Sequence, residues 1–323
     1  MDKIRYAVVG VGNMGKHHAR AAHELPELEL VGVVDANLEQ GQAIARLYGC
    51  EAFTDLGEMV RSCRPQAVSV CVPTSLHERI GLACIELGLN MLMEKPIAGS
   101  VEEGERLIDA ARQRGVVLMA GHIERYNPAV LKVKEMIDRG DIGKVVSIMA
   151  RRVGVFPPQI KDANIAVDLA IHDIDVANYL LGETPLRVTS EKRRNHIELR
   201  EDSVELFLRY SNASAFIQAN WITPVKIRKL NITGTDGYID MDYVNQRILY
   251  YKSNYEKYRE DPGHVGGYAD YVLKYLEPDL TEINVAKREP LKEEILHFLR
   301  GVRGEEAIDP AYAIDALRVA LEA

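Results

Sequence analysis

The sequence predicts an α/β fold in which a doubly wound parallel sheet is followed by an α+β domain with a large, mostly antiparallel sheet. Three observations support this prediction. A glycine-rich turn at residues 10–15 joins a β-rich run to a helix-forming run. Strand-like and helix-like segments then alternate to about residue 120. After that point, strand-like runs follow one another with tight turns. We therefore expect domains at residues 1–121 and 122–323.

Length and composition restrict the class of protein. A chain of 323 residues can form two domains with separate cores. Its net charge of −8 argues against a nucleic-acid or membrane-surface partner. The sequence has no apolar run of membrane-spanning length and no signal-peptide pattern, so we expect a cytoplasmic protein. The four cysteines lack Cys-x-x-Cys spacing, which argues against a zinc site and against a disulfide framework.

The first turn has the pattern Gly-x-Gly-x-x-Gly, formed by Gly10, Gly12 and Gly15. It follows a strand-like run at residues 4–9 and precedes a helix-forming run. In a dinucleotide-binding fold the first glycine allows the tight turn, the second lets the pyrophosphate approach the backbone, and the third lets helix and strand pack closely. The free N–H groups at the helix start favour phosphate charge.

A second predicted strand, at residues 28–34, ends in Asp35, which lies twenty residues after Gly15. In dinucleotide-binding folds an acidic residue at this position holds the hydroxyls of the adenosine ribose. Its charge would repel a 2′-phosphate, and no arginine follows it. We therefore expect NAD as the cofactor rather than NADP.

The alternation continues with further predicted helices and strands. Helices are expected at 38–48, 56–63, 73–88 and 100–115, and strands at 52–54, 67–72, 90–93 and 116–120. Ligands of such sheets bind beyond the carboxyl ends of the strands. The residues at or just past those ends are expected to line one crevice: Gly10, Asp35, Pro73, Lys95 and His122.

The second half reads as α+β. A helix from Pro128 to about residue 139 has Asn127 as its cap. Strands are expected at 145–153, 186–193, 203–210, 213–221, 228–233, 238–244 and 247–252, and helices at 165–181, 291–302 and 311–321. We expect helices on one face of this sheet, which leaves the other face as a subunit contact.

Asp168 and His172 lie four residues apart on one predicted helix and share a face. A carboxylate beside an imidazole orients the ring and stabilises its protonated form, which suits a general acid or base. The same spacing also occurs in surface pairs and in buried histidines held by a carboxylate, and for an isolated pair that alternative is favoured. A metal site built from His172, Asp173 and Asp175 is rejected, because their offsets place them on different helix faces.

Lys95 ends a predicted parallel strand, where its side chain would point into the ligand crevice. There a lysine can neutralise a developing alkoxide. Pro96 restricts Lys95 to extended geometry. From these residues alone, a surface lysine at a strand end is an equally good interpretation.

Four motifs occur in order along the chain: Gly10–Gly15 with His18, Val72-Pro73-Thr74 with His77, Glu94-Lys95-Pro96, and Asp168-x-x-x-His172. Together they resemble the glucose–fructose oxidoreductase/inositol dehydrogenase (Gfo/Idh/MocA) family, and the resemblance covers essentially the whole chain. It implies a Rossmann domain, and an α+β domain whose open sheet forms homodimers or homotetramers. It also implies that Lys95, Asp168 and His172 form the catalytic group and contact the substrate. The cofactor-binding residues expected on this basis are Gly10, Gly12, Asn13, Met14, Gly15, Asp35, Val72, Pro73, Thr74, His77, Glu94 and Lys95.

Within the family, residues 121–128, 168–175 and 221–228 look most like the branch of UDP-N-acetylglucosamine 3-dehydrogenase-like enzymes. This resemblance implies hydride transfer from a sugar-nucleotide hydroxyl to NAD, with His172 accepting the hydroxyl proton. Asp168 would support the imidazolium, and Lys95 would stabilise the alkoxide.

Further residues are candidates for substrate contacts. Arg125 and Asn127 follow the sixth strand, although Asn127 also suits helix capping. A diphosphate could be held by basic residues that singly read as solvated strand charges: Arg151, Arg152, Lys226 and Arg228. Three alternatives stay open: a free polyol such as inositol as substrate, a UDP-sugar uronate as substrate, or a non-catalytic NAD-binding regulator of the galactose-repressor type.

Overall fold

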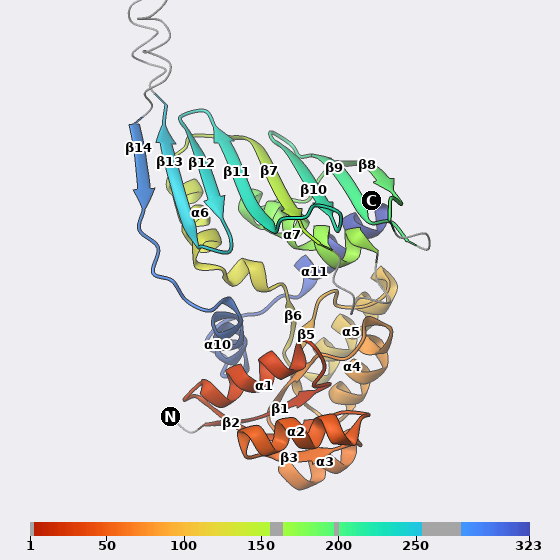
Figure 1. The fold of residues 1–323 in the computed structure, drawn as a ribbon. Coiled ribbons are helices and arrows are strands. Elements are labelled where there is room, and N and C mark those ends of the chain that lie inside the picture. The colour runs from red at the N-terminus through yellow and green to blue at the C-terminus, as the bar shows by residue number, and fades with distance from the viewer. Residues whose placement is uncertain (1–2, 156–163, 197–199, 254–278) are drawn as a thin grey trace, which may run out of the picture. The chain divides into compact units, whose positions relative to one another are not determined.

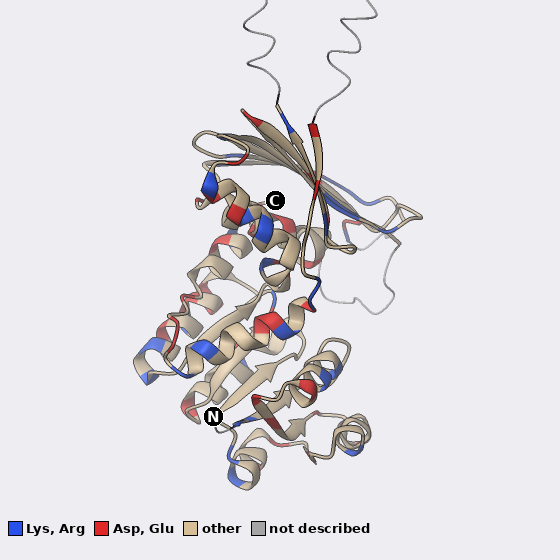
Figure 2. Ribbon diagram, turned by 90° about the vertical axis from the view of Figure 1, so that its left-hand side faces the viewer, with Lys and Arg blue, Asp and Glu red and all other residues tan. Residues whose placement is uncertain are grey.

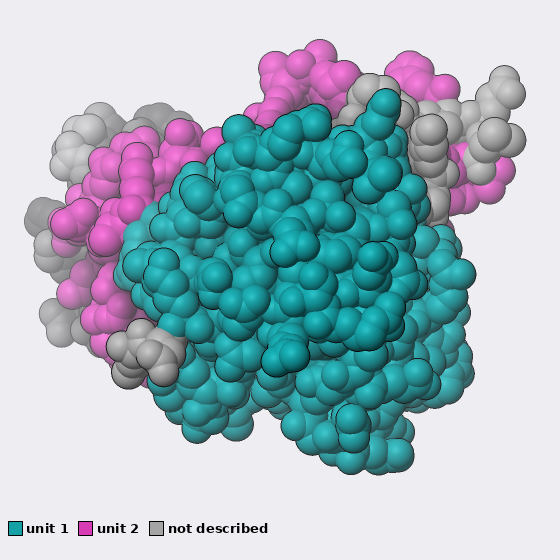
Figure 3. All heavy atoms as spheres, turned by 90° about the horizontal axis from the view of Figure 1, so that it is seen from below, with its two compact units in different colours: residues 1–126, 288–318 teal, residues 127–287, 319–323 magenta. Residues whose placement is uncertain are grey.

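The computed structural model describes residues 3–155, 164–196, 200–253 and 279–323 (Figure 1). The chain forms two compact units, drawn in different colours in Figure 3. The first unit contains residues 1–126 and 288–318, and the second contains 127–287 and 319–323. This division differs from the expected one, which assigned all of 122–323 to the second domain.

The first unit is built on a parallel sheet of six strands in the order β3-β2-β1-β4-β5-β6. The strands are β1 (Ile4–Val9), β2 (Leu28–Val34), β3 (Glu51–Phe53), β4 (Ala67–Val70), β5 (Asn90–Glu94) and β6 (Leu118–Gly121). The order reverses between β1 and β4, as in dinucleotide-binding folds. This arrangement confirms the predicted doubly wound sheet.

The connecting helices begin and end at recognisable signals. They are α1 (Gly15–Glu24), α2 (Leu38–Tyr48), α3 (Leu56–Cys63), α4 (His77–Glu86) and α5 (Val101–Arg114). The Asn37 side chain caps α2 by accepting from the Gln40 amide, and Asp55 caps α3 in the same way. Gly49 and Gly115 end α2 and α5 in the left-handed conformation.

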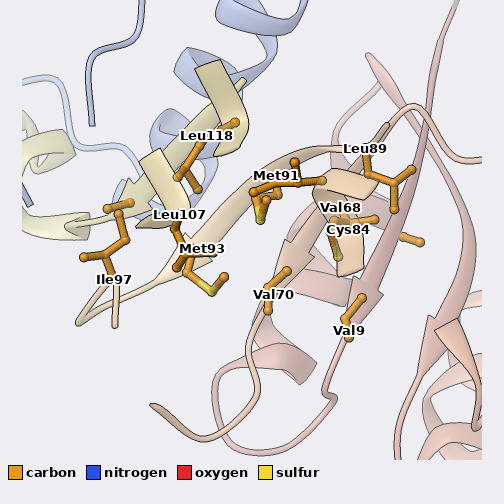
Figure 4. Packing of buried hydrophobic residues seen from close by; sticks show 14 of the residues in the cluster. Val9, Val68, Val70, Cys84, Leu89, Met91, Met93, Ile97, Leu107 and Leu118 are labelled. Atoms are coloured by element: carbon orange, nitrogen blue, oxygen red, sulfur yellow. The ribbon is translucent and has the colours of Figure 1, made fainter. Parts of the chain in front are cut away.

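The two faces of this sheet carry separate apolar clusters. Met91 and Met93 of β5 point to one face, where they lie in a cluster with Leu107 of α5 (Figure 4). Leu92, between them, belongs to the cluster on the other face. Successive strand residues point to opposite faces, so a strand covered on both sides is apolar throughout.

Two helices from the end of the chain complete this core. Helix α10 (Pro290–Val302) buries Ile295 and Phe298 in the cluster that contains Leu92, and the Phe298 ring meets the Tyr6 ring edge to face at 6.4 Å. Helix α11 (Ala311–Glu322) contributes Ile314 to the opposite cluster. A parallel sheet needs cover on both faces, which explains why residues 288–318 group with the first unit.

The second unit is built on an eight-stranded sheet in the order β14-β13-β12-β11-β7-β10-β9-β8. The strands are β7 (Val145–Val153), β8 (Arg187–Arg193), β9 (Ser203–Arg209), β10 (Ser214–Asn220), β11 (Ile227–Gly234), β12 (Gly237–Asp242), β13 (Arg247–Lys252) and β14 (Asp279–Ile283). β7 pairs in parallel with β10, and the other pairings are antiparallel. This confirms the predicted, mostly antiparallel sheet, to which β14 adds a strand that was not predicted.

The two faces of the second sheet differ. Helix α7 (Ile171–Leu181) packs on β7 and β10, and α6 (Pro128–Arg139) packs on α7. On the other face, Phe216 stands in register between Phe207 and Met149. These three side chains are 36%, 50% and 49% exposed, and they form an apolar row across three strands.

Along the coloured ribbon of Figure 2, basic and acidic residues are interspersed. Among the helices that the structure describes, none combines the length and the apolar character required to cross a bilayer. All four cysteines are free thiols.

Candidate active site

The turn after β1 has a shape that requires glycine at two positions. Gly10 has φ +83°, and a Cβ there would lie 2.9 Å from the Cys71 carbonyl carbon. A Cβ on Gly15 would lie 1.8 Å from the Gly10 carbonyl oxygen. The first and third glycines of the motif therefore allow the turn and the close approach of α1 to β1.

Gly12 differs, because a Cβ on it would meet only the Gln40 side chain, at 4.0 Å. The backbone at Gly12 thus faces open space beside the start of α1, where Met14 gives no side-chain cap to the helix. This space and the first amides of α1 fit the pyrophosphate of NAD. Asn13 and Met14 are exposed between the two glycines.

Asp35, just past β2, is held in one orientation by two backbone amides. Its Oδ2 accepts a hydrogen bond from the Val11 amide at 2.8 Å, and its Oδ1 accepts one from the Asn37 amide at 2.8 Å. The Gln40 side chain in turn donates to the Val11 carbonyl at 2.8 Å. The carboxylate therefore lies beside the glycine turn, which fits its predicted role toward the ribose.

The ends of β4 and β5 are linked by His77, the first residue of α4. Its Nδ1 lies 2.8 Å from the Pro96 carbonyl oxygen and its Nε2 lies 3.0 Å from the Val72 carbonyl oxygen. The side chain is buried, and burial lowers its pKa while the two carbonyls act in the opposite direction. Its ring nitrogens thus contact the backbone segments that carry Val72 and Lys95. Pro73 and Thr74 lie between Val72 and His77, where Thr74 begins a short 3₁₀ turn.

Glu94 ends β5 and is 8% exposed. Its Oε1 lies 2.9 Å from Nε2 of His18 in α1, and its Oε2 accepts from the Lys95 amide at 3.1 Å. Burial opposes ionisation of Glu94, but the hydrogen bond from His18, together with the charge and the backbone amide of Lys95, outweighs it and lowers the pKa of the carboxyl. Lys95 itself is half-buried at the same edge of the sheet.

Two residues of this cluster, Ser69 and Tyr6, were not candidates from the sequence. Nδ1 of His18 lies 2.8 Å from the Ser69 hydroxyl, which lies 2.6 Å from the Tyr6 hydroxyl. Both are fully buried. Ser69 carried a usable signal, because it is a polar residue inside the otherwise apolar run at 67–72.

At the end of β6, the His122 ring is buried against the Tyr312 ring, with their centroids 5.7 Å apart. The Arg125 guanidinium lies 4.0 Å from the centroid of the same tyrosine ring. Tyr312 belongs to α11 and was not a sequence candidate. In the second unit, Asn127 is buried, accepts from the Ala129 amide as a helix cap, and donates to the Tyr243 carbonyl.

Asp168 and His172 are both half-buried on one helical segment of the second unit. The segment does not begin as a regular α-helix. Residues Ala166–Ala170 form a π-helical turn, closed by a hydrogen bond from the Ile171 amide to the Ala166 carbonyl. Asn164 caps the segment by accepting from the Val167 amide at 3.0 Å. Single π-helical turns are frequently found at functional sites.

The basic candidates of the second unit occupy different environments. Arg151 and Lys226 are exposed, whereas Arg228 donates to the Val153 and Ile227 carbonyls. For Arg152 the prediction of a solvated strand charge is wrong, because this side chain is buried and forms an ion pair with Asp173. The period-2 pattern of β7 turns this arginine toward α7, where the carboxylate offsets its burial.

Comparison with known proteins agrees with this geometry. Residues 4–122 match the "Oxidoreductase family, NAD-binding Rossmann fold" domain of Gfo/Idh/MocA proteins, and residues 130–240 match the "GFO/IDH/MocA C-terminal domain". The chain is also 30% identical over 251 residues to scyllo-inositol 2-dehydrogenase (NAD(+)) of Bacillus subtilis, covering 73% of each protein.

The chain belongs to the Gfo/Idh/MocA family.

Another relative in the Gfo/Idh/MocA family is UDP-N-acetylglucosamine 3-dehydrogenase of Acidithiobacillus ferrooxidans. Its sequence is 28% identical over 311 residues, which is 95% of this chain and 91% of the relative. A solved structure of that enzyme superposes with a TM-score of 0.84 at 26% identity, covering 100% of this chain and 97% of the other. The chain is an oxidoreductase of a sugar dehydrogenase family that acts on CH–OH groups, with an NAD-binding Rossmann domain.

Proposed function

We propose that this enzyme oxidises UDP-N-acetylglucosamine at C3 to the 3-keto sugar. The observation that carries the redox reaction is the position of Lys95, at the carboxyl end of β5 on the same sheet edge as the Gly10–Gly15 turn and Asp35. The choice of a sugar nucleotide is supported by the extent of the likeness to the Acidithiobacillus enzyme, which includes both domains.

In this proposal each catalytic residue has one task. His172 accepts the proton of the substrate hydroxyl, and Asp168 stabilises the imidazolium that results. Lys95 stabilises the negative charge that develops on the substrate oxygen. NAD, when bound, accepts the hydride. The turn at Gly12 and the carboxylate of Asp35 bind and orient the cofactor.

A free polyol is the second candidate substrate. It is favoured by the 30% identity to the Bacillus subtilis scyllo-inositol dehydrogenase, although that likeness extends over 251 residues rather than 311. Both candidates share the same hydride chemistry. They differ in whether the second domain recognises a diphosphate.

Two further properties are part of the proposal. The exposed row of Phe207, Phe216 and Met149 supports a homodimer or homotetramer formed through the open sheet. The four free cysteines suit a reducing compartment, so we place the reaction in the cytoplasm.

The deciding experiment follows NADH formation with four substrates: UDP-N-acetylglucosamine, its uronate, myo-inositol and glucose. We expect turnover with UDP-N-acetylglucosamine, and a fall in kcat of roughly 100-fold or more in Lys95→Ala and in His172→Gln. Turnover with inositol alone would mean that the substrate is a free polyol and that the hydride-transfer reaction is as proposed. Calorimetry that detects tight NAD binding without turnover on any substrate would favour the regulator alternative.

A further inference from the structure

Four polar side chains form a continuous buried chain inside the first unit. The Tyr6 hydroxyl in β1 lies 2.6 Å from the Ser69 hydroxyl in β4, and Ser69 lies 2.8 Å from Nδ1 of His18 in α1. Nε2 of His18 then lies 2.9 Å from Oε1 of Glu94 in β5. The first three side chains are fully buried. Polar groups are costly at such depth unless each is hydrogen-bonded.

The direction of these hydrogen bonds follows from the Tyr6 end. Burial raises the pKa of Tyr6, so its hydroxyl keeps its proton. Within the part of the chain that the structure describes, the acceptor for this proton is Ser69 Oγ. Among the described residues the partners of Ser69 Oγ are Tyr6 and His18, so the Ser69 proton is donated to Nδ1 of His18, which therefore carries no proton. His18 is thus neutral and donates from Nε2 to Glu94.

Glu94 is the last member of this chain of hydrogen bonds and the one that contacts the segment of Lys95. One carboxylate oxygen accepts from His18, and the other accepts from the backbone amide of Lys95. Gly121 of β6 closes the other side, because a Cβ there would lie 3.3 Å from the Glu94 Cα. Glu94 is therefore held from two neighbouring elements, and it fixes the first peptide of the segment that carries Lys95.

We propose that Tyr6, Ser69 and His18 are positioning residues that hold Glu94, and through it the backbone of Lys95, in the geometry required for hydride transfer. The proposal rests on the catalytic role of Lys95 proposed above. These residues do not contact the substrate. They determine the position of the Lys95 ammonium group. Displacement of a catalytic group by about 1 Å costs on the order of 100-fold in rate.

The test compares two substitutions of His18. His18→Gln keeps an N–H donor for Glu94, whereas His18→Leu removes both polar contacts. We expect His18→Leu to lower kcat by roughly 10- to 100-fold with little change in KM or in NAD affinity, and His18→Gln to recover most of that loss. Equal losses in both variants, or a loss confined to KM, would overturn the proposal.

Buried tyrosines offer a matched control. The Tyr210 hydroxyl donates to Asn178 at 2.8 Å in the second unit, and it is as buried as Tyr6 but has no link to Glu94. Tyr6→Phe should lower both kcat and stability, whereas Tyr210→Phe should lower stability alone. Ser69→Ala interrupts the same chain of hydrogen bonds with a smaller change in volume. It replaces His18→Leu as the test variant if His18→Leu does not fold. Equal kcat losses in Tyr6→Phe and Tyr210→Phe would mean that the chain of hydrogen bonds has only a structural role.

Two readouts need no substrate. The imidazole ¹⁵N shifts of His18 should report a protonated Nε2 and an unprotonated Nδ1, and the opposite tautomer would contradict the assignment. In the whole protein, hydrogen exchange of the Lys95 amide should speed up at least about tenfold in His18→Leu relative to His18→Gln. Unchanged exchange would show that Glu94 does not depend on the chain.

The two proposals fail differently. If Lys95→Ala retains full turnover, the catalytic role of Lys95 is wrong, whatever His18 does. If Lys95→Ala is inactive while His18→Leu keeps its kcat and its protected Lys95 amide, only the positioning proposal is wrong.

Discussion

Arg152 donates to both carboxylate oxygens of Asp173, with Nε 2.6 Å from Oδ2 and Nη2 3.0 Å from Oδ1. Both side chains are almost completely buried, and the Arg152 guanidinium also lies 4.8 Å from the centroid of the Tyr243 ring. The ion pair joins β7 to α7 at the residue next to His172. It therefore fixes the helix on which the proposed acid–base pair stands.

Removal of one partner of this pair should destabilise the second unit strongly. Arg152→Leu leaves the Asp173 carboxylate buried without its charge partner, which costs about 3–5 kcal/mol. We expect a matching fall in the free energy of unfolding measured in urea. The exposed pair of Arg247 and Glu282 has the same two-point geometry on the same sheet, so Arg247→Leu is the control and should change stability little. Equal effects of the two substitutions would contradict this assignment.

Two glycines of the first turn should respond to alanine in different ways. Gly15→Ala forces a Cβ against the Gly10 carbonyl and should lower thermal stability as well as NAD binding. Gly12→Ala meets open space and should fold normally, but its methyl group occupies the space that fits the pyrophosphate. We expect calorimetry to show NAD affinity reduced at least tenfold, or about 1.4 kcal/mol, in Gly12→Ala. Normal affinity there would place the pyrophosphate elsewhere.

His77 should make the stability of the protein depend on pH in the weakly acidic range. Burial lowers its pKa in the folded state, so the unfolded chain binds a proton first as the pH falls. Its contribution to stability is complete above the unfolded pKa of about 6.5 and declines below it, by at most about 1.4 kcal/mol per pH unit. His77→Gln does not titrate and keeps N–H donors for the carbonyls.

Urea unfolding at several pH values between neutral and weakly acidic gives the comparison. The stability of His77→Gln should fall less steeply than that of the native protein. His17 and His297 also have pKa values lowered by burial, and they stay in both proteins, so they cancel. Parallel curves would mean that His77 does not titrate differently on folding.

The apolar row on the open sheet should control assembly. Phe216→Glu places a charge between Phe207 and Met149, and we expect the mass measured by light scattering to fall to that of a smaller species. Leu47 is a suitable control because it is an exposed apolar residue on α2 of the first unit. Leu47→Glu should leave the mass unchanged. An unchanged mass in Phe216→Glu would remove this face from the proposed interface.

Local structure was predictable where the sequence carries local signals. Helices α2 and α3 were predicted at their observed bounds, and Asn37, Asp55 and Gly49 mark ends of these helices by contacts with their nearest neighbours. Strand β14 was missed because its residues are mostly exposed and show no alternation of apolar and polar side chains.

Long-range partners were not predictable in the same way. The pattern of α10 shows an apolar face, but nothing in its periodicity says that this face covers Tyr6, which lies nearly the whole chain away. The buried partners of Arg152 and His18 likewise depend on which elements the fold brings together. The position of the glycine turn and of Lys95 was predictable, because both follow parallel strands, and the carboxyl ends of parallel strands lie at one edge of the sheet.

A ribosome making this chain releases the six strands of the parallel sheet long before helix α10, which begins at Pro290. At about 5–20 residues per second, the interval is on the order of ten seconds. During that time the sheet face around Leu92 and Met119 lacks the helix that finally buries it. The domain that is made first therefore cannot complete its core until nearly the whole chain has been synthesised.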